Sequence, residues 1–298
     1  MNSIENIYSP FRTGQYDGIL SLDLTLTTAC DVVILRSEET APTMVTLAGS
    51  DEFLQGSTFK KEGETLCIKV ESAEKEKPKD NRITVQCGFS QGKLLRITID
   101  GHCDVHAVPD FEECEIKVTG DGGIYAGNFR KATVEVNKAG DVELRDVGCL
   151  VATVNDEGDV SAETVGSLRF SVSGSGDIDI TRVTEQYKGE VASRSDLKIG
   201  EARNGDVAVS GWGDLKVNKC SGNMKLDMSG YCDVHLAGEV DALALEISGW
   251  GNLKASGLTA DNATLLLSGW ARAVIGRVKS VATEKAGQWC KLRVRRRG

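Results

Sequence analysis

Runs of alternating apolar and polar residues recur across residues 98–294, which is the pattern of short β-strands with one face turned inward. The runs are kept in phase by one position that follows a small-residue turn and recurs every 18–20 residues. We call this position the anchor column, and its members are Asp104, Gly123, Asp141, Asp159, Asp177, Asp196, Asp214, Asp233, Asn252, Arg272 and Lys291. A fixed period of this length is typical of a solenoid.

The residue after the anchor is apolar in most coils, and we expect it to point into a shared core. Six members of this inward column are Val142, Val160, Ile178, Leu197, Leu215 and Val234. A coil of this length is too short for two helices, and the recurrent Gly would break a helix. One coil cannot bury its own apolar face, so the coils must stack. The sequence therefore predicts an all-β fold, a right-handed single-stranded parallel β-helix of about eleven coils, each with about three strands of 3–4 residues.

Residues 1–97 do not follow this repeat. They contain longer strand-like runs, such as residues 19–26, and a charged stretch at residues 71–82 that we expect to be a loop. An uncovered solenoid end would expose strand edges and apolar core. We therefore expect residues 1–97 to open and cap the solenoid, residues 98–294 to form the regular coils, and residues 295–298 to form a basic tail.

All four Trp stand at one place in the repeat, two residues before the anchor. With one Tyr they form a column spaced by 19–20 residues, which consists of Trp212, Tyr231, Trp250, Trp270 and Trp289. Small residues flank the first four, so we expect the rings of Trp212, Tyr231, Trp250 and Trp270 to stack along one turn edge, partly open to solvent. Two residues after the anchor, an outward column carries Lys216, His235 and Lys254. These eight residues are our candidate binding residues.

An aromatic column beside a basic one suits the docking of an extended partner. Ring faces and cation–π contacts can hold a glycan, and Trp and Tyr are enriched in protein interfaces. The same rings can also form a purely structural ladder. We expect a non-catalytic binding or adhesion module that docks a protein or an extended glycan. The alternative is a structural, self-associating solenoid, and we expect neither a nucleic-acid partner nor a cofactor.

The acidic members of the anchor column are a second candidate site, because Ca²⁺ binds carboxylate oxygens. We favour hydrogen bonds between each Asp and the backbone N–H groups of its own corner, because Asn, Arg and Lys replace Asp without breaking the repeat.

Two Cys/His clusters, residues 102–106 and 232–235, resemble zinc ligands. They lie seven coils apart, and their Cys fill a slot held elsewhere by Gly, Ser or Ala. We therefore expect no metal site.

Catalysis is a third alternative, since some β-helix proteins are polysaccharide lyases or hydrolases. Their carboxylates stand on long loops, whereas the coil lengths here vary by only two residues. This regularity leaves no loop to build a catalytic cleft. We therefore expect that the protein is not an enzyme.

Three segments in order carry a family resemblance: residues 45–51 (VTLAGSD), residues 63–70 (GETLCIKV), and repeats of the type found at residues 173–178 (SGSGDI). Their arrangement resembles the putative auto-transporter adhesin, head GIN domain family over roughly residues 15–294. The resemblance implies a right-handed β-helix without established catalytic residues. It also implies an exported or lipid-anchored protein.

Composition and charge exclude further classes of protein. The 33 Gly have no period of three, which excludes collagen, and no apolar run is long enough to cross a membrane. The net charge of −9 hides an asymmetry, because residues 198–298 hold 15 Lys and Arg against 10 Asp and Glu. We expect the basic C-terminal end to be solvated.

The N-terminus and the cysteines indicate in which cellular compartment the protein acts. Residues 1–18 are polar and lack a secretory leader, so we expect a cytoplasmic protein if Met1 is native, and an exported or cell-surface protein if a leader was removed. The chain has nine Cys and no CxxC motif, which predicts free, packed thiols rather than a disulfide framework.

Overall fold

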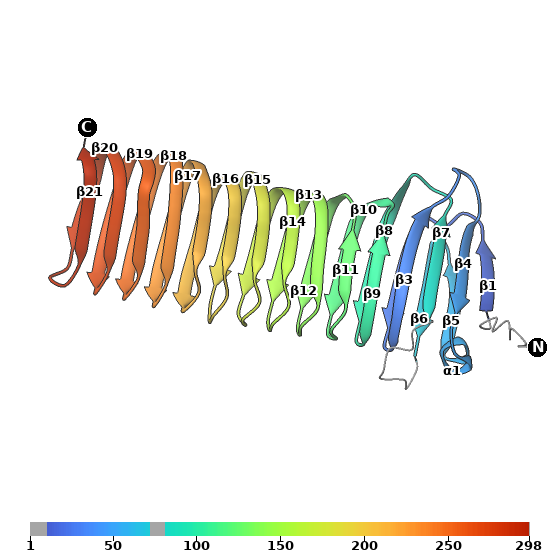
Figure 1. The fold of residues 1–298 in the computed structure, drawn as a ribbon. Coiled ribbons are helices and arrows are strands. Elements are labelled where there is room, and N and C mark those ends of the chain that lie inside the picture. The colour runs from blue at the N-terminus through green and yellow to red at the C-terminus, as the bar shows by residue number, and fades with distance from the viewer. Residues whose placement is uncertain (1–10, 72–80, 298) are drawn as a thin grey trace, which may run out of the picture. The chain divides into compact units, whose positions relative to one another are not determined.

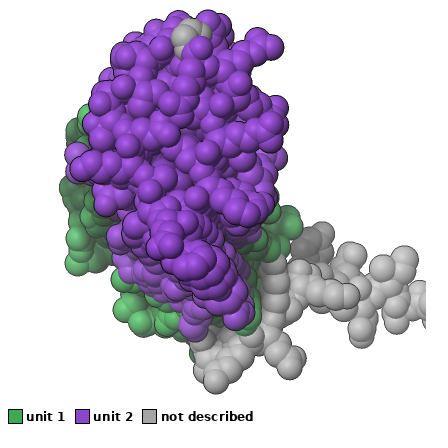
Figure 2. All heavy atoms as spheres, turned by 90° about the vertical axis from the view of Figure 1, so that its left-hand side faces the viewer, with its two compact units in different colours: residues 1–130, 140–143 green, residues 131–139, 144–298 purple. Residues whose placement is uncertain are grey.

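The computed structural model describes residues 11–71 and 81–297. The protein is nearly all β, with 75% of residues in strands and 2% in helix, and it forms a parallel β-solenoid of about eleven turns (Figure 1). This result confirms the predicted fold class and excludes a helical repeat. The expected loop at residues 71–82 lies mostly outside the described residues. The chain divides into two compact units, which are residues 1–130 with 140–143 and residues 131–139 with 144–298 (Figure 2).

Unit 1 combines parallel coils with a few antiparallel strands. Its described elements are β1 (Phe11–Tyr16), β2 (Ser21–Leu26), β3 (Ala29–Arg36), β4 (Thr43–Ala48), α1 (Asp51–Gln55), β5 (Ser57–Glu62), β6 (Thr65–Val70), β7 (Arg82–Cys87), β8 (Gln91–Ile99), β9 (His102–Ala107), β10 (Asp110–Val118) and β11 (Gly123–Ala126). The short helix α1 begins after Ser50, whose hydroxyl accepts a hydrogen bond from the N–H of Phe53 at 3.1 Å. Phe53 itself is fully buried, which anchors the helix.

The first coil in the sequence of unit 1 is an interior coil in space. Strand β2 lies between β6 and β8 and is parallel to both, and β3 lies in the same way between β7 and β9. Antiparallel strands then follow on the outer side, where β5 pairs with β6, β4 with β7, and β1 with β4. These strands satisfy backbone groups that would otherwise stand at an open sheet edge.

Unit 2 is a regular stack of parallel coils. Its strands are β14 (Val160–Val172), β15 (Ile178–Val191), β16 (Leu197–Gly211), β17 (Leu215–Gly230), β18 (Asp233–Gly249), β19 (Asn252–Gly269), β20 (Arg272–Ala286) and β21 (Lys291–Arg297), and β12 (Phe129–Val136) and β13 (Asp141–Val154) cross the unit boundary. Each strand from β14 to β19 pairs in parallel with the next one along the chain. The pairing of β20 with β21 completes the series.

The expectation of three short strands per coil is wrong. From β14 to β20, each coil is one strand of 13–18 residues. The strand bends where its pairing register shifts, as between Val165 and Ser167 of β14. Hydrogen bonding to the neighbouring coil resumes directly after each bend, so the bends do not divide the coil into separate strands.

The predicted inward column is confirmed. All six of its members are at most 1% exposed. The pairing register places Ile178 beside Leu197 and Leu197 beside Leu215, so side chains at the same depth pack directly on one another. Burial of each such aliphatic side chain stabilises the fold by about 1.5–3 kcal/mol.

We predict that Ile178→Asp destabilises the fold by several kcal/mol. The change removes a buried aliphatic side chain and leaves a carboxylate in the core without a partner. Urea unfolding monitored by circular dichroism measures the loss, with Ile178→Val as the conservative control at about 0.5–1.5 kcal/mol. A loss from Ile178→Asp that did not exceed the loss from the control would contradict the inward column.

Candidate functional site

Five aromatic side chains form one unbroken stack in unit 2. This aromatic ladder consists of Trp212, Tyr231, Trp250, Trp270 and Trp289. Successive ring centroids lie 5.0–5.3 Å apart, and successive ring planes differ by 13–20°. All five side chains are exposed, at 48–67% of their full accessible surface. The predicted stack of the first four rings and its exposure to solvent are confirmed, and Trp289 extends the stack by one ring. A docking role for the ladder stays a prediction.

A column of glycines places the rings. The residues directly before the first four rings are Gly211, Gly230, Gly249 and Gly269. Their φ angles of 76–145° lie in a region that side chains strain to reach. A Cβ on Gly230 would also lie 2.7 Å from the backbone of Gly211 in the preceding coil. Because the coils approach so closely here, the N–H of Tyr231 donates to the carbonyl of Gly211 at 2.7 Å, which fixes the start of each aromatic side chain.

Stacking decides which part of each ring meets the solvent. The faces of Tyr231, Trp250 and Trp270 are each turned toward two stacked neighbours, so these three rings expose mainly their edges. Trp212 and Trp289 stand at the ends of the ladder and have one stacked neighbour each. Aromatic rings carry negative charge on the face and positive charge at the edge. The middle of the ladder therefore presents positively polarised edges rather than the faces that attract cations.

The acidic part of the anchor column forms a second ladder. Each of four carboxylates accepts a hydrogen bond from the backbone N–H of the next anchor along the chain, at 2.7–3.2 Å. These acceptors are Asp159, Asp177, Asp196 and Asp214. The expectation that each Asp bonds its own corner is therefore wrong. Stacking in register brings the N–H of the next coil within reach of the carboxylate, so the bond ties two coils together.

The three predicted basic residues stand beside this acidic ladder. The Nζ of Lys254 lies 2.6 Å from Oδ2 of Asp233. Burial raises the pKa of Asp233, but the hydrogen bonds from Lys254 and Asn252 outweigh burial, so the pKa of Asp233 lies below its ordinary value. The charge of His235 acts in the same direction on this carboxylate. The side chain of Lys216 has no hydrogen bond or ion pair within the described residues, and the role of all three in binding stays a prediction.

An open pocket of about 550 Å³ lies between the aromatic ladder and the last members of the anchor column. Its lining includes four of the five ladder rings, from Tyr231 to Trp289. The polar part of the lining comes from Asn252, Arg272, Gln288 and Lys291. Sequence reasoning did not select Arg272 and Lys291 as site residues. The available signal was the change of sign within the anchor column, from Asp in earlier coils to Arg and Lys in the last two.

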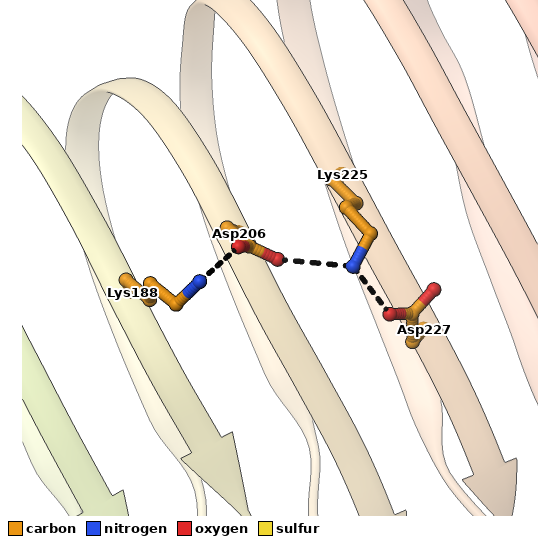
Figure 3. A network of polar contacts seen from close by, with 4 residues as sticks. All are labelled: Lys188, Asp206, Lys225 and Asp227. Carbon is orange, nitrogen blue, oxygen red and sulfur yellow. Dashed lines mark hydrogen bonds and ion pairs between the residues drawn. The ribbon is translucent and has the colours of Figure 1, made fainter.

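Several cations on the sides of the coils have acidic partners in neighbouring strands. Lys188 of β15 lies 2.6 Å from Asp206 of β16, and Lys225 of β17 contacts both Asp206 at 3.4 Å and Asp227 at 2.8 Å (Figure 3). The hydrogen bond from Lys188 holds the pKa of Asp206 below its ordinary value. In the part of the chain that the structure describes, the side chains of Arg272 and Lys291 have no such partner.

Residues 23–202 and 199–288 match the family described as putative auto-transporter adhesin, head GIN domain. The chain belongs to this family. The resemblance seen in the sequence is thereby confirmed, and family membership suggests a binding protein rather than an enzyme.

Solved structures of low sequence identity match this head GIN domain protein, and the one from Bacteroides fragilis shares its fold. A putative adhesin from Bacteroides fragilis has a TM-score of 0.52 and 15% identity, over 77% of this chain and 97% of that chain. A putative adhesin from Parabacteroides distasonis has a TM-score of 0.49 and 13% identity, over 85% of this chain and 97% of that chain. Among curated proteins, none matches the sequence significantly.

The histidines of the first Cys/His cluster of the head GIN domain protein, residues 102–106, make other contacts. The ring of His106 stacks on Tyr125 with centroids 4.7 Å apart, and Nδ1 of His102 lies 3.4 Å from Asp121. The described residues hold no group of three or more His, Cys, Asp or Glu side chains placed to bind a metal ion. Nor does any helix among them have the length and apolarity needed to cross a membrane. Sequence reasoning missed the His106–Tyr125 stack, although both residues stand two positions after an anchor.

The nine cysteines differ in accessibility. Cys149 and Cys290 are half-buried, whereas Cys87 and Cys220 are buried. Burial raises the pKa of Cys87 and of Cys220 to about 12. Since the thiolate is the reactive form, such thiols react slowly at neutral pH.

We predict that Gly230→Ala destabilises the protein by about 1–3 kcal/mol, the usual cost of a residue forced into a disfavoured backbone conformation. The new Cβ would also press on the backbone of Gly211. Thermal unfolding measures the loss. The control is Gly257→Ala, where φ is not positive and a Cβ would touch only the Cβ of Ala237, at 3.3 Å. Equal stability of the two variants would rule out the glycine column as the constraint that places the rings.

We predict that iodoacetamide at pH 8 modifies Cys149 and Cys290 of the native protein before the buried thiols. Partial exposure admits the reagent at these two sites, whereas burial and raised pKa values protect Cys87 and Cys220. Peptide mass spectrometry measures the order. After denaturation without a reductant, all nine thiols in the sequence should titrate, and a stable count of seven or fewer would argue for a disulfide.

Proposed function

We propose that this protein is a non-catalytic adhesion module that docks an extended partner, a protein or a glycan, along the aromatic ladder. The observation that carries the proposal is the unbroken stack of five exposed rings on one edge of unit 2. Family membership among putative adhesins supports the binding role.

The exposure of the ladder argues for a partner. In unit 2, the described large hydrophobic side chains that stand exposed are the five rings themselves. The other large hydrophobic side chains described in unit 2 are buried or half-buried, so the exposed rings stand apart from the rest. Exposed apolar patches of this kind mark interaction sites, and aromatic residues contribute strongly to them. A ladder that served stacking alone would gain stability from being covered.

The regularity of the coils supports a binding module over an enzyme. Each coil of unit 2 returns to the same anchor within 18–20 residues, so no long loop rises beside the ladder to close a cleft. The carboxylates nearest the ladder already accept hydrogen bonds from backbone N–H groups or from Lys254. These bonds assign the acidic column a structural role.

A self-associating solenoid is the second candidate function. Strand β21 pairs with β20 on one side, and its inward residues Leu292 and Val294 are only half-buried. A second copy could add a strand to this edge. Five of the seven residues of β21 are Lys or Arg, however, and like charges oppose the approach of two such edges.

Family membership also bears on where the protein acts. The expected cytoplasmic location is not supported by a family of adhesins, whereas the alternative, an exported or cell-surface location, agrees with it. We therefore propose that the aromatic ladder faces the exterior of a cell.

We predict that Trp250→Ala, at the centre of the aromatic ladder, abolishes binding to an array of glycans and surface proteins. Loss of one central ring interrupts the stack and removes its contact area. Thermal stability should fall by about 1–3 kcal/mol at most, since each stacked pair contributes about 0.5–1.5 kcal/mol. Tyr125→Ala is the matched control, because it removes an exposed, stacked ring of unit 1. Unchanged binding by Trp250→Ala together with a loss of stability would show that the ladder is purely structural.

A further inference from the structure

We propose that the pocket at the C-terminal end of the aromatic ladder is a subsite for an acidic glycan, in which Arg272 and Lys291 bind the carboxylate of a sugar unit. This inference rests on the proposed function, because it names the ligand class of the same ladder. It adds two residues that sequence reasoning did not select. We call the pocket lined by Trp250, Trp270 and Trp289 with these two cations the acidic subsite.

The charge of the anchor column reverses at this point. The column is acidic through Asp233, neutral at Asn252, and basic at Arg272 and Lys291. Four of the earlier carboxylates accept hydrogen bonds from backbone N–H groups, and those of Asp177 and Asp233 also accept from a lysine, so the acidic anchors have structural partners. Arg272 and Lys291 occupy the same position in the repeat, but their side chains do not form the hydrogen bonds that the carboxylates form. Their place in the repeat is fixed by the fold, but their charge is not explained by it.

The two cations are uncompensated within the described residues. Arg272 pairs in register with Lys291, so their Cα atoms stand about one strand spacing, ~4.8 Å, apart. Both side chains are exposed, and neither has a hydrogen bond or ion pair in the part of the chain that the structure describes. From residue 270 onward the sequence holds nine Lys and Arg against Glu284 alone. An anion between Arg272 and Lys291 would relieve their mutual repulsion and could accept charge-assisted hydrogen bonds from both.

The exposed parts of the rings favour the same ligand charge. Trp250 and Trp270 direct their faces at ladder neighbours and their positively polarised edges at the solvent. Such edges attract the oxygen atoms of hydroxyl and carboxylate groups. The lining of the pocket adds the side-chain amide of Gln288, which can both donate to and accept from sugar hydroxyls. Ring edges, amide and cations together suit a sugar that carries a carboxylate.

The backbone of the ladder coils before β21 favours a glycan over a peptide strand. An extended peptide binds by adding to a free sheet edge through backbone hydrogen bonds. Along the ladder these donors are already used, since the N–H of Trp250 donates to Gly230 and the N–H of Trp270 donates to Gly249. The ring spacing of 5.0–5.3 Å is also close to the length of one pyranose unit in an extended chain. A linear glycan can therefore present one sugar to each coil.

The test compares an oligogalacturonate with its fully methyl-esterified form, which has the same sugar backbone but lacks the carboxylate charges, by isothermal titration calorimetry. The wild-type protein should bind the acid about tenfold or more tightly than the ester, because only the acid can form charge-assisted bonds. This preference should shrink as salt is raised. The double variant Arg272→Asn, Lys291→Asn should bind both probes alike, and Asn is already accepted by the column at position 252.

A matched variant controls for net charge. Lys219→Asn with Lys225→Asn removes two cations elsewhere in unit 2, and it should keep the preference for the acid. Circular dichroism of all variants checks the fold. Modification of Cys290, which lines the pocket, gives a second readout, because bound oligogalacturonate should slow its alkylation while that of Cys149 stays unchanged.

The outcomes separate this inference from the proposed function. Equal binding of acid and ester by the wild-type protein, binding of neither, or a preference that survives in the double variant would overturn the acidic subsite and leave the ladder proposal standing. Polyglutamate that competes as well as oligogalacturonate would replace the glycan with an acidic peptide. Full binding of oligogalacturonate by Trp250→Ala would instead count against the ladder itself.

Discussion

The structure of unit 2 depends on one constraint, which is that each coil stacks on the next in register. Register turns every position of the repeat into a column of like side chains about one strand spacing apart. For aliphatic residues this register stabilises the core, because Ile178, Leu197 and Leu215 pack on one another there. Register also aligns the glycines, and the backbones of neighbouring coils can approach closely at these positions because no Cβ intervenes. The aromatic ladder is the outward result of the same rule.

Charged columns are the difficult case under this constraint, because register places like charges side by side. The acidic anchors solve the problem by bonding to the N–H of the following coil, and Lys254 adds a cation beside Asp233. On the sides of the coils, Lys188 and Asp206 alternate in sign between neighbouring strands (Figure 3). Arg272 and Lys291 follow neither solution within the described residues. What makes this pair informative about a ligand is that two cations without a partner stand next to each other in the pocket beside the rings.

The sequence was sufficient to predict what depends on the period. Coil number, the inward column and the stacked rings all follow from counting 18–20 residues between equivalent positions, since the period alone decides which side chains meet. Features that depend on neighbours in space were not predictable. Three features can be seen only once the strand pairing is known. They are the hydrogen bond between Asp177 and the next coil, the interior place of β2 in unit 1, and the unbroken strand in each coil. Helix α1 and the pocket around Arg272 belong to the same class.

The glycine column also determines how such a surface can change in length. Each of the first four rungs of the ladder is encoded by one self-contained segment, in which Ser and Gly precede the ring, as in Ser229-Gly230-Tyr231 and Ser248-Gly249-Trp250. Duplication of one such segment would add one rung at the same spacing and leave the other rungs in place. Deletion would shorten the ladder by the same step. The length of the aromatic surface is therefore a whole number of repeats. Selection can lengthen or shorten it one repeat at a time without changing the contacts within the remaining repeats.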